Sequence, residues 1–408
     1  MEHFLKCMDC GAQYDPGEIV YICRSCGGLL EAQYDYNKIP ENLNERWSKR
    51  PLSVWRYREL LPIDDVSKTV SLQEGGTSLQ RCKRLGENLK LHSIFVKNEG
   101  ENPTGSFKDR GMTVGASKAI ELGARIVACA STGNTSASLA AYAAKAGFTA
   151  IVFIPSGKIA LGKLTQAMVH GAKIIQIRGN FDDALKTVMN FAETHREVYL
   201  LNSVNPYRIE GQKSLAYEVF NQLENRAPDT VVLPVGNAGN ISAIWKGFVD
   251  LHKLGMLKKL PRMVGLQAEN SAPITTAFRQ RKREIQAVAC PETVATAIRI
   301  GYPVSWKKAL NAVRDSDGLM ETVSDKEILE AQKLLARLEG LFIEPASAAS
   351  IAGLKKLAEM GEIDADEEVV CVATGHGLKD PDIIISLYER PIEVNLDTDP
   401  LEKVLEAV

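Results

Sequence analysis

The sequence lacks an uninterrupted apolar stretch of the length that crosses a bilayer as a helix, about 20 residues. It also shows no secretory signal, because Met1 to Cys7 contain neither a basic head followed by an apolar run nor a small-residue cleavage site. Together these absences predict a protein that works in the cytoplasm and has no membrane partner.

An excess of charge of either sign is absent as well. The 408 residues include 49 Lys and Arg against 51 Asp and Glu, and the basic residues are scattered along the chain. A nucleic-acid-binding protein normally carries a basic patch or stripe, so this composition indicates no nucleic-acid partner. With 45% hydrophobic residues the chain can bury substantial cores. We therefore expect a globular protein of several lobes whose partners are small molecules or copies of itself.

Cysteine is unevenly distributed, with two Cys-x-x-Cys pairs near the N-terminus: Cys7 with Cys10, and Cys23 with Cys26. Two thiolates at this spacing fit adjacent corners of a tetrahedron, and the glycine after each pair lets the backbone turn. The gap between the pairs is slightly shorter than the ~15–20 residues typical of zinc ribbons. The pattern predicts a structural zinc site; a disulfide pair and a metal-free relic are the alternatives, and four thiolates leave no open position for catalysis.

The other four cysteines stand alone in apolar or mixed segments. We expect each to be a buried, reduced thiol without a function of its own. They are Cys82, Cys129, Cys290 and Cys371.

After an irregular segment from 36 to about 70, predicted to wrap the main body as an arm, short β-branched runs alternate with helical patterns. Such alternation predicts βα units and open parallel sheets. The predicted strands are 126–130, 150–154, 173–177, 230–235, 263–267 and 369–373, and the predicted helices are 134–146, 181–194, 209–224 and 240–254.

Ligands in such folds bind at the carboxyl ends of strands, where loops lead into helices. The strand at 126–130 is followed by Ser131 to Ser138, a turn rich in hydroxyl groups that suits a carboxylate, although one such residue suffices for an ordinary helix cap. The strand ending near Val235 leads into Gly236 to Asn240, whose small residues and amide groups suit a phosphate. A plain tight turn is the alternative there, because the loop is neither a Walker A nor a G-x-G-x-x-G motif.

A third segment, 101–111, places Lys108 at a predicted helix start. A lysine there opposes the helix dipole unless its ammonium charge is removed, for example by condensation with an aldehyde. A solvated surface lysine remains the alternative from this segment alone.

These segments resemble the motifs of a known family. Residues 103–110, Pro-Thr-Gly-Ser-Phe-Lys-Asp-Arg, resemble the lysine motif of the fold-type II (tryptophan synthase β-like) enzymes that use pyridoxal 5′-phosphate (PLP), and the threonine synthases in particular. Residues 236–240 resemble their cofactor-phosphate loop, and 374–380 resemble their C-terminal signature. The resemblance runs from about 70 to 385, includes the motifs at 73–77 and 344–348, and extends to the cysteine-rich N-terminus of some members.

The resemblance implies an α/β fold of two open-sheet lobes preceded by a zinc-ribbon-like segment. The implied division is a ribbon at 1–35, an arm and part of the large PLP lobe at 36–97, a small lobe at 98–205, the rest of the large lobe at 206–390 and a tail at 391–408. A homodimer is typical of such relatives.

The resemblance also implies roles for individual residues. Lys108 would hold PLP and move protons. The other cofactor contacts would be Asn134, Gly236, Asn237, Ala238, Gly239, Asn240 and Thr374, the last facing the pyridine nitrogen. The substrate contacts would be Ser131, Thr132, Asn134 and Thr135 for the carboxylate, and Asn202, Ser203, Arg208 and Asn240 elsewhere, with Arg208 clamping a phosphate and Lys213 as a further candidate.

The activity implied is that of a carbon–oxygen lyase, which forms L-threonine and phosphate from O-phospho-L-homoserine and water in the last step of threonine biosynthesis. Two alternatives keep the cofactor: a cysteate synthase-like paralogue acting on O-phosphoserine, and a threonine/serine dehydratase. A third is a non-catalytic scaffold that binds a macromolecule through the ribbon, but the ribbon lacks the clustered aromatic and Arg residues this would need.

Overall fold

The computed structural model describes residues 3–156, 164–179, 181–195 and 197–387. Its strands form three separate sheets, a small one at the N-terminus and two in the body of the protein. The tail predicted at 391–408 lies outside the described residues. No helix of the described part is both long and apolar enough to pass through a membrane.

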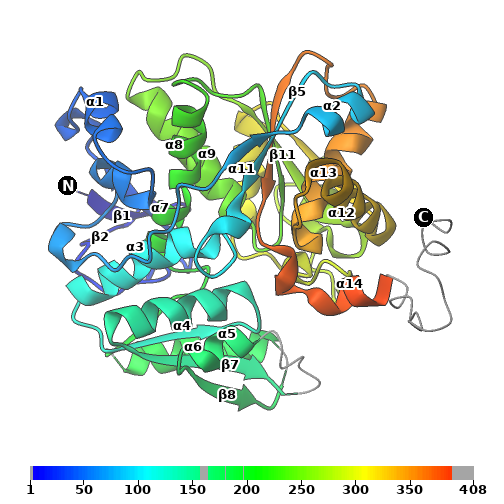
Figure 1. Ribbon diagram of the computed structural model, residues 1–408. Coiled ribbons are helices and arrows are strands. Elements are labelled where there is room, and N and C mark those ends of the chain that lie inside the picture. The colour runs from blue at the N-terminus through cyan, green and yellow to red at the C-terminus, as the bar shows by residue number, and fades with distance from the viewer. Residues whose placement is uncertain (1–2, 157–163, 180, 196, 388–408) are drawn as a thin grey trace, which may run out of the picture.

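The N-terminal sheet has β1 (His3–Cys7) between β2 (Gln13–Tyr14) and β3 (Leu30–Tyr34), all antiparallel. Alternate side chains of β1 and β3 are buried, as expected when one face of a sheet packs on a core. That core joins the cysteine-rich segment to Val114 and Tyr207, which belong to two helices of the main body. Figure 1 shows β1 and β2 beside these helices, α3 (Lys108–Glu121) and α7 (Pro206–Gln212).

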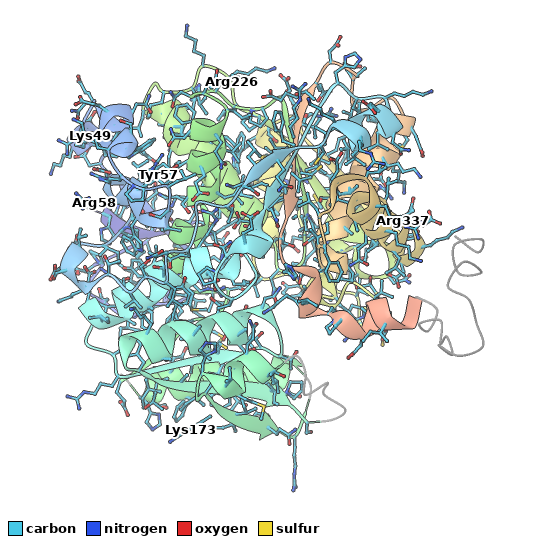
Figure 2. All side chains as sticks on the ribbon, viewed as in Figure 1. Lys49, Tyr57, Arg58, Lys173, Arg226 and Arg337 are labelled. Atoms are coloured by element: carbon cyan, nitrogen blue, oxygen red, sulfur yellow. The ribbon has the colours of Figure 1, made fainter. Side chains whose placement is uncertain are left out.

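The segment predicted as an irregular arm contains short helical turns: η1 (Tyr36–Lys38), α1 (Leu43–Ser48), η2 (Val54–Leu60) and η3 (Val66–Lys68). Aromatic side chains fasten it to the body. Trp47 and Tyr57 pack edge to face with ring centroids 4.9 Å apart, and both contact Tyr217. Tyr57 points inward in Figure 2, whereas the labelled basic residues extend outward on separate parts of the surface, in keeping with the absence of a basic stripe among them.

The small lobe has a parallel sheet in the order β8-β7-β6-β9. Its strands are β6 (Ile126–Ala130), β7 (Thr149–Pro155), β8 (Lys173–Ile177) and β9 (Val198–Leu200). Helices α4 (Asn134–Ala146), α5 (Thr165–Val169) and α6 (Phe181–Thr194) belong to this lobe, and α3 packs on α4. The predicted strands 126–130 and 173–177 and helices 134–146 and 181–194 are confirmed to the residue.

The large lobe has a six-stranded sheet in the order β12-β11-β10-β13-β5-β4. All pairs are parallel except the edge strand β4, which runs antiparallel to β5. The strands are β4 (Leu79–Arg81), β5 (Ser93–Asn98), β10 (Thr230–Pro234), β11 (Arg262–Ala268), β12 (Leu319–Val323) and β13 (Glu368–Ala373). The chain therefore begins this sheet, leaves it to form the small lobe, and returns. The exact domain boundaries stay a prediction.

Helices cover both faces of the large sheet, each over its own apolar core. On one face lie α8 (Ser214–Gln222), α9 (Gly239–Lys253) and α11 (Trp306–Asp315). On the other lie α2 (Lys83–Leu89), α12 (Asp325–Glu339) and α13 (Pro345–Glu359). Helices α10 (Pro273–Arg279) and α14 (Pro381–Leu387) complete the lobe.

Two sequence-based expectations are wrong. The single helix predicted at 209–224 is two helices, α7 and α8, which meet at Lys213 because a tight turn there brings the Ser214 hydroxyl to the Gly211 carbonyl, 2.7 Å away. Cys290 is exposed, whereas the other three isolated cysteines are buried as expected. Cys290 lies in an irregular connection between α10 and α11 and not in a strand or helix that a core would cover.

Candidate active site

Lys108 begins α3, and the residues just before it are tied to the large lobe. The Phe107 amide donates to the Thr374 carbonyl at 3.0 Å, and the His376 amide donates to the Gly105 carbonyl at 2.9 Å. The lysine segment and the C-terminal signature, far apart in sequence, are thus paired through their backbones. The small residues of both segments allow this approach: a Cβ on Gly105 would come within 3.3 Å of the Lys379 side chain.

The loop that leads to Lys108 is held by its neighbour Asp109. The Asp109 carboxylate accepts hydrogen bonds from the Thr104 amide at 2.7 Å, the Thr104 hydroxyl at 2.7 Å and the Ser138 hydroxyl at 2.5 Å. Burial raises the pKa of Asp109 to about 6, against the effect of these hydrogen bonds. The orientation of Lys108 is therefore set by an aspartate bonded to both its own loop and α4.

The next residue, Arg110, lies in a buried ionic network. It donates to Glu99 at 2.6 Å and to Glu218 at 2.7 Å, and Glu218 also accepts from Lys97 at 2.9 Å. These four side chains carry two charges of each sign and are fully buried. Pairing of this kind is needed to keep charges in a protein interior. The network joins β5, α3 and α8 behind the candidate site.

The Lys108 amine is electrostatically unusual. Burial lowers the pKa of the Lys108 amine to about 7, and the positive charge of Arg208 contributes to the same shift. The Glu344 carboxylate acts in the opposite direction. An amine with such a pKa is present in substantial part as the neutral nucleophile at neutral pH. The solvated surface lysine considered as an alternative does not fit this environment.

Glu344 connects the two lobes. The Asn134 amide at the start of α4 donates to Glu344 at 3.0 Å, and the Thr374 hydroxyl donates to it at 3.2 Å. Thr374 also exchanges a hydrogen bond of 2.9 Å with Ser347. A Cβ on Gly375 would lie 2.7 Å from the Glu344 carboxyl carbon, so a side chain at 375 would displace the carboxylate. Burial raises the pKa of Glu344.

The predicted phosphate loop has the geometry of an anion site. Ala238 adopts a left-handed conformation with φ of 65°, which directs the chain into α9 at Gly239. Asn240 is buried, and neither polar atom of its side chain has a hydrogen-bond partner. Amide groups at the start of a 15-residue helix, together with its dipole, favour an anion. A residue outside the loop also holds it, because the Ser305 amide donates to the Asn237 carbonyl at 3.1 Å.

One side chain links this loop to the lysine helix. A Cβ on Gly111, one turn after Lys108, would lie 2.9 Å from the Gln212 amide nitrogen, and a Cβ on Gly239 would lie 3.9 Å from the Gln212 amide oxygen. That oxygen is buried without a partner. The lysine helix and the phosphate loop are therefore only one side chain apart.

Arg208 on α7 forms a second candidate anion site. The residue is 1% exposed, yet only its Nη1 is bonded, to the Leu201 carbonyl at 3.1 Å, while Nε and Nη2 have no partner. Burial lowers the pKa of the guanidinium to about 10. A buried cation with two unused donors is costly unless an anion completes it. This observation points to a phosphate or carboxylate beside Lys108.

Two polar residues predicted to bind the substrate phosphate with Arg208 have their side chains bonded to other protein groups. The Asn202 side chain accepts from the Ala130 amide at 2.8 Å and donates to the Ala130 carbonyl at 3.0 Å, so it holds the end of β6. Lys213 pairs with Glu210 at 2.6 Å and Asp250 at 2.8 Å, away from Arg208. Ser203 is partly exposed and Asn240 belongs to the phosphate loop.

The hydroxyl-rich turn divides into an open part and a structural part. Ser131, Thr132, Asn134 and Thr135 are partly exposed, whereas Ser136 and Ser138 are buried. Ser136 donates to the Gly133 carbonyl at 2.8 Å, and Ser138 holds Asp109. The four partly exposed residues remain the predicted carboxylate contacts.

Glu344 received no role in the sequence analysis, although it lies in one of the motifs. Its only signal in the sequence was a lone acidic side chain before Pro345 and a run of small residues.

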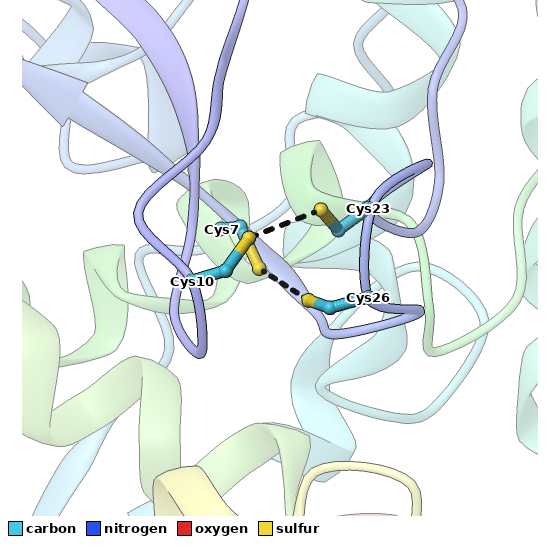
Figure 3. A group of neighbouring side chains, drawn as sticks. All are labelled: Cys7, Cys10, Cys23 and Cys26. Carbon is cyan, nitrogen blue, oxygen red and sulfur yellow. Dashed lines mark hydrogen bonds between the residues drawn. The ribbon is translucent and has the colours of Figure 1, made fainter.

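The four N-terminal cysteines converge, as Figure 3 shows. The Cys7 and Cys26 sulfur atoms lie 3.4 Å apart, those of Cys10 and Cys23 lie 3.5 Å apart, and all four are within 4.8 Å of one another. Four sulfurs about 2.3 Å from a zinc ion would be ~3.8 Å apart, so the arrangement suits a tetrahedral ion. Gly11 and Gly27 take positive φ and let each pair turn back on itself.

Comparison with known proteins gives consistent results. The chain matches the family described as "Pyridoxal-phosphate dependent enzyme" over residues 70–375. It is 57% identical to a curated threonine synthase from Methanocaldococcus jannaschii over 98% of each chain, and 54% identical to one from Methanosarcina acetivorans over 99% of this chain and 98% of that one. Among solved structures, maize serine racemase has the same fold, with a TM-score of 0.64, 20% identity, and coverage of 76% of this chain and 91% of that chain.

Proposed function

Because the chain belongs to the pyridoxal-phosphate dependent enzymes, and among them to the threonine synthases, we infer that it converts O-phospho-L-homoserine and water into L-threonine and inorganic phosphate. One observation at the site supports this assignment. Lys108, whose pKa is lowered, lies near the buried Arg208, which has two donors without a partner. A reaction that uses a phosphorylated cofactor and a phosphorylated substrate needs two anion sites, and the loop at 236–240 supplies the other.

The residues present fit PLP. Lys108 would hold its aldehyde carbon, the loop from Gly236 to Asn240 its phosphate, and Thr374 its pyridine nitrogen, with Asn134 near the ring oxygen. When bound, the cofactor supplies an electron-withdrawing ring that stabilises negative charge on substrate carbon atoms. The Thr374 hydroxyl is a neutral partner, so it cannot enforce protonation of the ring as an aspartate would.

Lys108 then acts as the acid and base of the reaction. A group whose pKa is close to the working pH both takes up and releases protons readily. Burial and the Arg208 charge place the Lys108 amine in that range. Elimination across Cβ and Cγ followed by addition of water needs protons moved between neighbouring carbon atoms, and one mobile amine between the lobes serves these transfers.

Arg208 would bind the phosphate of the substrate. Its Nε and Nη2 atoms form the pair of donors that suits bidentate contact with a phosphate, and its burial removes competition from water. Asn202 contributes indirectly, since it fixes the end of β6 from which Ser131 follows. The carboxylate of the substrate would lie on the exposed turn of Ser131, Thr132, Asn134 and Thr135.

The four cysteines would hold a zinc ion, supported by their mutual distances. Four thiolates complete a tetrahedral set, so its role would be structural. Assembly as a homodimer and location in the cytoplasm remain predictions from the resemblance and the sequence.

The test is direct. Purified protein with PLP and O-phosphohomoserine should release threonine and phosphate in equal amounts. Absence of turnover by protein that has bound the cofactor would contradict the assignment. Parallel reactions with O-phosphoserine and sulfite, and with threonine or serine alone, test the two alternatives that keep the cofactor.

A further inference from the structure

The cysteine-rich segment packs on the part of the chain that leads to and includes α7. The Tyr21 hydroxyl accepts from the Leu200 amide at 2.7 Å, and the Tyr207 hydroxyl donates to the Pro16 carbonyl at 3.1 Å. A third contact joins β3 to α7, where the Tyr34 hydroxyl donates to the Glu210 carboxylate. The same short stretch, 200–210, carries Arg208.

Tyr34 contacts a group of buried and partly buried charges. The second Glu210 oxygen accepts from Lys246, which also donates to the Ala32 carbonyl of β3 at 2.6 Å. Lys213 pairs with Glu210 and lies 4.1 Å from the centre of the Tyr34 ring. Burial and the adjacent Glu210 charge raise the pKa of Tyr34 well above its usual range, so its hydroxyl stays a donor.

Helix α7 is too short to hold its own orientation. It has seven residues, and isolated helices of this length are unstable in water without packing. Tyr207 and Glu210 are three positions apart, so they share one face, which the cysteine-rich segment covers. On another side, a Cβ on Gly211 would lie 1.9 Å from the Arg110 carbonyl of α3. The helix is therefore wedged between α3 and the N-terminal sheet.

We propose that Tyr34 is a positioning residue for the substrate-phosphate site: through Glu210 it fixes α7 against α3 and so directs the unused donors of Arg208 toward the ligand. The cysteine-rich segment thereby acts on substrate binding rather than only on stability. The cofactor loop has further anchors that do not involve α7, because the Ser305 and Val304 amides donate to Asn237. The proposal rests on the proposed function, which assigns Arg208 to the substrate.

Tyr34→Phe tests this, because it removes only the hydroxyl and keeps the ring. We expect KM for O-phosphohomoserine and the dissociation constant of inorganic phosphate for the PLP-loaded enzyme to rise roughly three- to tenfold, the effect of a small misplacement of a binding group. Both kcat and PLP affinity should stay within about twofold of the parent, since the hydrogen bonds of Asp109 beside Lys108 and of Asn237 in the cofactor loop do not involve α7.

The matched control is Lys307→Met. It removes an exposed contact of 2.9 Å between Asp9 of the same segment and α11, and leaves α7 alone. Unchanged KM and phosphate affinity in Tyr34→Phe, an equal rise in Lys307→Met, or a loss confined to kcat would each overturn the proposal. Should Tyr34→Phe fail to fold, Tyr207→Phe removes the other hydroxyl on that face, with the same expectations and the same contradicting results.

Calorimetric titration of inorganic phosphate into the PLP-loaded protein separates this proposal from the assigned reaction. If the parent protein shows no turnover, the proposed function fails, yet the comparison of phosphate affinity between parent and Tyr34→Phe still decides the positioning role.

Discussion

The Asn134 side chain at the start of α4 donates a hydrogen bond of 3.0 Å to Glu344 at the start of α13. One residue belongs to the small lobe and the other to the large lobe, so this contact crosses the candidate site next to Lys108. Glu344 also receives the Thr374 hydroxyl at 3.2 Å. Three residues assigned to the cofactor thus lie around one carboxylate.

The first prediction concerns Lys108 itself. Lys108→Ala should lower turnover by about three orders of magnitude or more, because both the nucleophile and the proton carrier are removed. The visible absorbance of the bound cofactor should disappear, while the circular dichroism spectrum stays that of the parent. Turnover retained at the parental level would exclude the assigned role.

Capture of the cofactor should depend on pH. Only the neutral amine attacks the aldehyde, so below a pKa of about 7 the capture rate of cofactor-free protein should rise with pH, and above it level off. Stopped-flow absorbance measures this, with free lysine and PLP as a reference for the titration of PLP itself. A rate that keeps climbing beyond pH 9 would mean an ordinary lysine pKa.

Removal of the Arg208 guanidinium should weaken substrate binding. Arg208→Met should raise KM for O-phosphohomoserine by about 10- to 100-fold, the range expected for a charge-assisted hydrogen bond. Arg226→Met is the control, because Arg226 forms an ion pair at the surface with Glu368 and should matter little. Equal kinetics for the two variants would argue against a phosphate site at Arg208.

Loss of the Asn240 side chain should affect the cofactor. Its two unpartnered polar atoms lie at the start of α9, so Asn240→Ala should weaken PLP binding by roughly tenfold. Equilibrium titration of cofactor-free protein gives the dissociation constant. An unchanged PLP dissociation constant together with a raised KM would contradict a role in cofactor binding and assign Asn240 to the substrate.

The N-terminal cysteines should bind one zinc ion per chain. Cys10→Ser should lower both the zinc content, measured by plasma mass spectrometry, and the unfolding temperature, because a ligand of a structural site is lost. Cys290→Ser alters another exposed cysteine, far from this cluster in sequence, and should change neither. Full zinc occupancy after Cys10→Ser would contradict a four-thiolate site.

Sequence patterns predicted those elements whose residues carry a strong local signal. The β-branched runs of β6 and β8 gave their exact bounds, whereas β4 was missed because it is a three-residue edge strand with exposed side chains. Strand β5 was missed in part because it contains Lys97, whose buried charge is paired with Glu218. Such long-range pairing leaves no periodic trace in the sequence.

The same distinction applies to the site. Lys108 and the loop at 236–240 were predicted because they follow strands or begin helices in recognisable motifs. The hydrogen bonds between Asn202 and Ala130, and between Tyr34 and Glu210, join residues from distant segments of the chain. Neither side chain type nor spacing along the chain indicates such contacts.

The proposed reaction depends on a covalent bond between the Lys108 amine and the aldehyde of the cofactor. Borohydride reduction of the PLP-loaded enzyme makes the lysine–cofactor bond permanent, and peptide mass spectrometry then locates the label. We expect the label on Lys108, in the peptide that contains Phe107 and Asp109. A label on any other lysine, with Lys108 unmodified, would contradict it.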